Sequence, residues 1–90
     1  MRSRLLALLL PLAVLLCAPD LATAASLQEV QDFGNNPSRA RMFVYVPDKV
    51  AASPPILVAI HYCGATANVY FTGTGYRALS DQHGFIVIYP

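Results

Sequence analysis

Residues 54–90 decide the fold, and they read PPILVAIHYCGATANVYFTGTGYRALSDQHGFIVIYP. Ile56–His61 is a continuous apolar run that follows two prolines, which is typical of a strand covered on both faces in a parallel sheet. Phe85–Tyr89 is a second run of the same kind. A helix predicted from Gly75 to His83 separates the two runs, so the segment indicates a right-handed parallel β-α-β crossover and an α/β fold.

The predicted helix has signals at both ends. Thr74 is a candidate N-cap, and Gly84 stands where a left-handed residue would end the helix. The residues expected to share one face of this helix are Tyr76, Leu79, Ser80 and His83.

An antiparallel β-hairpin is predicted before this unit. Leu27–Phe33 alternates loosely and reads as an edge strand, and Ala40–Val46 is rich in β-branched and aromatic residues. The turn residues Gly34–Ser38 would join them through a loop of about five residues. Pro47–Pro55 contains three prolines and ends the second strand.

Residues 1–24 have the pattern of a secretory signal peptide. Arg2 and Arg4 precede an apolar run from Leu5 to Cys17, and Ala22-Thr23-Ala24 supplies small residues before a cleavage site after Ala24. The alternative is a membrane anchor, but the run is shorter than the roughly 20 residues that a spanning helix needs. We therefore expect a secreted, extracellular protein without membrane association once the signal is removed.

The charge of residues 25–90 balances to zero, which excludes a strongly basic or acidic surface. The basic residues are Arg39, Arg41, Lys49 and Arg77, and the acidic ones are Glu29, Asp32, Asp48 and Asp81. No basic patch argues for a nucleic-acid partner. No metal-ligand spacing and no phosphate-binding loop is present, so we expect neither metal nor cofactor.

The segment after Ile56–His61 is the candidate site, because ligands bind beyond the carboxyl ends of strands in open α/β sheets. Residues 63–75 are predicted to form a long polar loop whose glycines let backbone amides approach a ligand. Such amides can form an oxyanion hole, where losing one donor costs roughly 2.7–4 kcal/mol in the barrier. Many loops of this kind bind nothing, so the residues alone leave both readings open.

Side chains near this loop are weaker candidates. His61 is interpreted as a hydrogen-bonded core residue that shapes the loop, and His83 as a surface residue at a helix C-terminus. The Cys63 thiol would need a neighbouring base to act as a nucleophile, and we do not assign it that role. The aromatic residues that could form a wall for sugar or phenolic groups, or simply pack, are Tyr62, Tyr70, Phe71 and Tyr76.

Taken together, these segments resemble the start of fungal acetylxylan esterases of the first carbohydrate-esterase family, which are related to feruloyl esterases and polyhydroxybutyrate depolymerases. The segments that carry the resemblance are Leu27–Pro37, Phe43–Pro47, Val58–Cys63, Leu79-Ser80 and Gly84–Pro90.

This resemblance implies an α/β-hydrolase fold and a Ser-His-Asp mechanism. The nucleophile would lie in a Gly-x-Ser-x-Gly elbow, and all three triad residues are expected downstream of Pro90. By position, Cys63 matches the residue whose backbone amide helps form the oxyanion hole, and this is the one role that the resemblance assigns. Gly64 and Tyr70 are candidates for a substrate-contacting loop from their place after the strand. Gly64–Asn68 departs from the family's glycine- and threonine-rich stretch, which affects the assignment of the amide donor.

The resemblance thus implies that residues 25–90 are the incomplete amino-terminal portion of a monomeric esterase domain. The whole enzyme would remove acetyl groups from acetylated xylan, and this portion by itself would be inactive. A feruloyl esterase or a polyester depolymerase would share the pattern. The alternative of another class is a non-catalytic carbohydrate-binding fragment.

Overall fold

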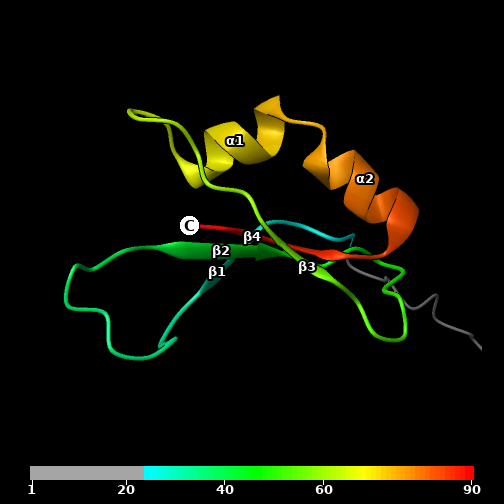
Figure 1. Cartoon of the computed structure of the whole chain (residues 1–90), viewed down its shortest axis with the longest axis horizontal. Coiled ribbons are helices and arrows are strands. Elements are labelled where there is room, and N and C mark those ends of the chain that lie inside the picture. Colours follow the sequence, from blue (N-terminus) through cyan, green and yellow to red (C-terminus); the bar gives the residue numbers. More distant parts are fainter. Residues whose placement is uncertain (1–23) are drawn as a thin grey trace, which may run out of the picture.

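A computed structural model describes residues 24–90 as a four-stranded mixed sheet with two helices on one of its faces (Figure 1). The elements in chain order are β1 (Gln28–Val30), β2 (Met42–Tyr45), β3 (Ile56–Val58), α1 (Ala67–Gly73), α2 (Tyr76–His83) and β4 (Ile86–Tyr89). The predicted signal peptide lies outside the described residues except for Ala24.

The sheet has the strand order β1-β2-β4-β3. β2 pairs antiparallel with both β1 and β4, and β3 pairs parallel with β4. The predicted hairpin and the predicted parallel β-α-β unit are therefore confirmed. Because β4 lies between β2 and β3, the last strand of the chain joins the hairpin to the crossover unit.

The hairpin connection is longer than predicted. It runs from Gln31 to Arg41 rather than over about five residues, because both strands are shorter than the sequence suggested. Asp32 and Arg39 have a φ of 54° and Gly34 a φ of 113°, so the backbone turns in several places between the strands.

The core lies between the sheet and the helices, and aromatic rings dominate it. The Phe71 ring of α1 lies 5.4 Å from the Tyr45 ring and 5.6 Å from the Tyr89 ring, the latter edge-on. The edge-on arrangement is one of the favoured aromatic geometries, and the Tyr45 and Phe71 rings are tilted by 49°. Val87, Ala59 and Ala67 complete the buried set.

The prediction that the strand at Ile56–His61 is covered on both faces is wrong for the described part of the chain. Leu57 and Ala59 face the helices, but Ile56, Val58 and Ile60 are 62%, 54% and 70% exposed. Residues alternate between the two faces of a strand, and residues 24–90 provide helices for only one face.

α2 ends as predicted but begins differently. Gly84 is its C-cap with φ 73°, and its amide donates to the Ser80 carbonyl. Ser80 is fully buried and its hydroxyl donates to the Phe85 carbonyl at 2.6 Å, which ties α2 to the start of β4. Of the four residues predicted to share one face of this helix, Ser80 is buried, whereas Leu79 is 44% exposed. The prediction of Thr74 as the N-cap is wrong, because Gly75 occupies that position.

Candidate oxyanion loop and the edge of the sheet

The segment predicted as one long loop contains a helix. α1 begins after Thr66, whose side chain accepts a hydrogen bond from the Val69 amide at 3.2 Å. Ala67 and Phe71 face the core at i and i+4. Thr74 ends α1, and its hydroxyl donates to the Tyr70 carbonyl. The loop is therefore limited to residues 59–66, here called the β3–α1 loop.

A tight turn forms the tip of the β3–α1 loop. The Ala65 amide donates to the Tyr62 carbonyl at 3.0 Å, and Gly64 has a φ of 84°. A positive φ at the third residue defines a type II-like turn and favours glycine there. Cys63 and Gly64 are the central residues of this turn, at the carboxyl end of β3.

The amides of Cys63 and Gly64 are the free donors of this turn. Among the described residues, 24–90, no acceptor receives a hydrogen bond from either nitrogen, whereas the Ala65 amide is paired. Both residues are exposed. An anionic oxygen that approached the tip would therefore compete with water, and not with a protein acceptor, for these backbone N–H groups.

A cavity of about 430 Å³ lies beside this loop. The strand ends and the helix start line it together, through Arg41, Phe43, His61, Ala65, Thr66 and Pro90 among others. β2 runs antiparallel to β4, so the start of β2 lies at the same end of the sheet as the carboxyl ends of β3 and β4. The hollow thus lies where α/β sheets bind ligands.

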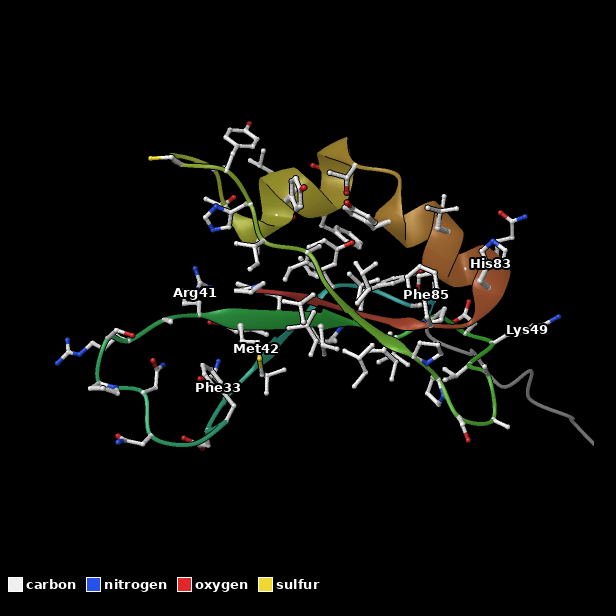
Figure 2. The ribbon with its side chains drawn as sticks, viewed as in Figure 1. Phe33, Arg41, Met42, Lys49, His83 and Phe85 are labelled. Atoms are coloured by element: carbon white, nitrogen blue, oxygen red, sulfur yellow. The ribbon has the colours of Figure 1, made fainter. Side chains whose placement is uncertain are left out.

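Arg41, which directly precedes β2, is the cationic residue that lines this cavity. Its guanidinium donates to both carboxylate oxygens of Glu29 at 2.8 and 2.9 Å and lies 4.9 Å from the centre of the Phe43 ring. The hydrogen bond from Arg41 lowers the pKa of the Glu29 carboxyl, and the same bond raises the pKa of Arg41. Figure 2 shows Arg41 on the helix side of β2 and the neighbouring Met42 on the opposite side.

The predicted histidines lie apart. His61 is half-buried rather than a core residue, and its Nδ1 lies 2.9 Å from the Tyr62 carbonyl oxygen, so its contact is within the loop. His61 borders the cavity because residues alternate between the two sides of an extended segment, and His61 falls on the same side as Leu57 and Ala59. His83 is exposed in the last turn of α2, as predicted, and points outward in Figure 2.

The aromatic residues do not form one wall. Phe71 is in the core, Tyr62 is 65% exposed in the loop, and Tyr70 and Tyr76 pair with ring centres 5.9 Å apart. Burial raises the pKa of the Tyr70 hydroxyl, and Tyr76 raises it further. Tyr70 lies in α1 and not in a loop, and its contact with substrate stays a prediction.

Cys63 has a free, exposed thiol in the described part of the chain. Across residues 24–90 no group of three or more His, Cys, Asp or Glu side chains could hold a metal ion. Within the same residues no helix is long and apolar enough to cross a bilayer.

Comparison with known proteins identifies esterases as relatives. The chain is 55% identical over 67 residues to acetylxylan esterase A of Aspergillus oryzae and 51% identical over 67 residues to feruloyl esterase B of Thermothelomyces thermophilus. A solved acetyl xylan esterase from Aspergillus awamori superposes with a TM-score of 0.70 at 54% identity, over 72% of this chain and 24% of that one. No family model matches.

This chain is homologous to part of these esterases. The two matches cover 74% of this chain but only 22% and 23% of the curated relatives, so the chain spans about a fifth of their length. The resemblance inferred from the sequence is confirmed at this level, and the α/β character of the fold agrees with the solved relative.

Proposed function

We propose that this chain is the amino-terminal part of a secreted serine esterase that removes acetyl groups from acetylated xylan. Residues 1–24 would be the signal peptide, and residues 25–90 the start of an α/β-hydrolase domain. The homology to acetylxylan esterase A carries this proposal. The free turn amides at the carboxyl end of β3 support it, because acyl transfer needs donors fixed where an oxyanion develops.

The residues of this chain would contribute binding of the oxyanion and no nucleophile. In the complete enzyme, a serine would attack the acetyl carbonyl while a histidine took its proton and an aspartate oriented that histidine. The Cys63 amide would donate to the oxygen of the tetrahedral intermediate, and Gly64 would hold the turn open with its positive φ. The chain by itself is therefore expected not to hydrolyse 4-nitrophenyl acetate or acetylated xylan.

The sharpest test of the Cys63 amide is Cys63→Pro in the esterase that carries this chain. Proline removes the N–H but suits the second position of the turn, so the loop keeps its shape. We expect kcat for acetyl release to fall roughly 100- to 1,000-fold with little change in KM. Cys63→Ala keeps the amide and should retain activity within about twofold.

A normal kcat in Cys63→Pro would assign the oxyanion to other donors. Serine-type turnover by the chain alone, titratable with an active-site phosphonate, would contradict the predicted downstream triad.

Feruloyl ester hydrolysis is the second candidate, because feruloyl esterase B is nearly as similar. Comparing release of acetate from acetylated xylan with release of ferulate from feruloylated xylan decides between them. A carbohydrate-binding module of the antiparallel sandwich type fits less well, since β3 and β4 pair in parallel.

A further inference from the structure

The segment before β1 is fastened to the connection between β2 and β3. The Ala25 backbone nitrogen donates to Asp48 Oδ1 at 3.1 Å, across 23 residues of sequence. The Ala25 side chain packs against the core cluster, and Leu27 follows it there. Residue 25 is thus held at a defined point, by a backbone donor on one side and an apolar contact on the other.

The signal-peptide cleavage predicted from the sequence falls directly before this residue, between Ala24 and Ala25. Hydrolysis of the Ala24–Ala25 peptide bond by a signal-processing peptidase adds the hydroxyl of water to the Ala24 carbonyl carbon. The Ala25 nitrogen is left as a primary amine, which takes up a proton at neutral pH because an α-amino group has a pKa of about 7.7–8.0. The single amide donor at Asp48 would become an ammonium with three donors and a positive charge.

The other charged side chains around Ala25 have contacts of their own or point away, so the Asp48 carboxylate is available to accept from the Ala25 nitrogen. A cavity of about 290 Å³ is bordered by Ala24, Ala25, Tyr45, Asp48, Lys49, Arg77 and Asp81. The Tyr45 hydroxyl donates to Asp81 at 2.5 Å, and the Arg77 guanidinium lies 5.8 Å from the centre of the Tyr45 ring. Lys49 points outward into solvent in Figure 2. Within residues 24–90, Ala25 supplies the hydrogen bond that Asp48 accepts.

We propose that Asp48 is the binding site for the mature α-ammonium group of this chain. Processing after Ala24 would convert an amide hydrogen bond into an ion pair, which fastens the start of β1 to the β2–β3 connection. This inference rests on the signal-peptide cleavage in the proposed function, and it does not depend on the reaction that the esterase catalyses.

The test measures the α-amino group of the purified secreted protein. Mass spectrometry of its first peptide should give Ala25 as the amino-terminal residue. Competitive acylation against pH then gives the pKa of that amine. An exposed ion pair should raise this pKa enough to slow acylation at pH 7 roughly two- to fivefold relative to Asp48→Asn.

Asp32→Asn is the matched control, because Asp32 is exposed, carries the same charge and tolerates asparagine at its positive φ. It should leave the acylation rate unchanged. In a protein that retains Ala24, the α-ammonium group lies one residue before the nitrogen that contacts Asp48. Its acylation should therefore be as fast as in Asp48→Asn.

Either of two results would overturn the proposal. One is a mature chain that begins at another residue, and the other is an equal acylation rate in the natural protein and Asp48→Asn. Ester hydrolysis measured on the same samples keeps failure of the proposed function separate, since the amine readout needs no activity.

Discussion

Gly84 has a positive φ and a crowded Cα, at the point where α2 turns into β4. Its φ is 73°, and a Cβ there would lie 2.8 Å from the Ala51 nitrogen and 3.1 Å from the Lys49 carbonyl oxygen. The Ala51 amide also donates to the Gly84 carbonyl at 3.0 Å, so the β2–β3 connection is bonded against this glycine. A side chain would have to displace that connection.

We therefore expect Gly84→Ala to destabilise the protein by about 2–4 kcal/mol, because left-handed strain adds to a backbone clash. Gly73→Ala is the matched control, since no atom outside its chain neighbours and its own helix backbone lies within 4 Å of its Cβ position, and its φ is not left-handed. It should be neutral or stabilising by up to about 1 kcal/mol. Urea unfolding measures both, and equal midpoints for the two variants would show that the connection yields to the methyl group.

Tyr89 places a hydroxyl in the core without a partner. Its side chain is fully buried, and its oxygen has no hydrogen bond within the described part of the chain. We expect Tyr89→Phe to raise the free energy of unfolding by about 1 kcal/mol, because a buried unpaired polar atom is removed. Tyr45→Phe should lower it by about 1–2 kcal/mol, since it deletes the bond to Asp81.

Ionisation of the Tyr89 hydroxyl should make the free energy of unfolding depend on pH. Burial raises the pKa of the Tyr89 hydroxyl above its ordinary value of about 10. Folding therefore favours the neutral form of the hydroxyl. The free energy of unfolding is unaffected by this group below about pH 10 and falls as the pH rises through the folded pKa, because the unfolded state loses the proton first. Thermal unfolding between pH 9 and 11 should show a smaller loss of stability in Tyr89→Phe than in the natural protein. A steeper loss in the variant would contradict the buried neutral hydroxyl.

At the scale of elements, α1 connects stability to the candidate site. Its N-cap Thr66 directly follows the turn formed by Cys63 and Gly64, and it lines the neighbouring cavity. Thr66→Ala removes the side-chain acceptor for the Val69 amide and should cost about 1 kcal/mol, whereas Thr66→Ser should cost a few tenths. If the complete protein has the proposed esterase activity, we expect Thr66→Ala to lower its kcat as well, because the β3–α1 loop loses the helix N-cap that follows it. An unchanged kcat together with a lowered free energy of unfolding would show that α1 does not position the β3–α1 loop for the proposed reaction.

The elements differ in how well their sequences reveal them. β2 and β4 were predictable, because their β-branched and aromatic runs match a half-buried pleat. α1 was missed, since Gly73 and Gly75 suggested a loop while Thr66, with Ala67 and Phe71 at i and i+4, was the helix signal. The sequence predicted a loop that begins at Cys63, and the family resemblance assigned the Cys63 amide to the candidate site. The tight turn at Cys63 and Gly64, and the lack of a protein acceptor for their amides, were not predictable, because hydrogen-bond pairing depends on tertiary contacts.

At the scale of the whole molecule, β3 is one of the two edge strands of the described sheet. This strand and the start of the loop after it carry highly exposed apolar side chains. Ile56, Val58 and Ile60 lie on the face without helices, and residues 54–63 contain no acidic side chain, lysine or arginine. Uncharged apolar edge strands invite further pairing. Since the relatives are more than four times as long as the matched region, we expect another strand to pair with β3 and a further element to cover this face in a protein of their length.

Amide hydrogen exchange tests this expectation residue by residue. The Ala59 amide donates to the Ile88 carbonyl at 2.8 Å, so the amides of Val58 and Ile60, which alternate with it, point to the open edge. In residues 25–90 alone, Ala59 should therefore be protected and its two neighbours should exchange at nearly unfolded rates. In a protein of the relatives' length, all three should be protected, because a second strand would accept the outward-pointing donors. Rapid exchange of Val58 and Ile60 in the longer protein would mean that β3 stays an edge strand. The loop that follows it would then border solvent rather than a further part of the proposed active site.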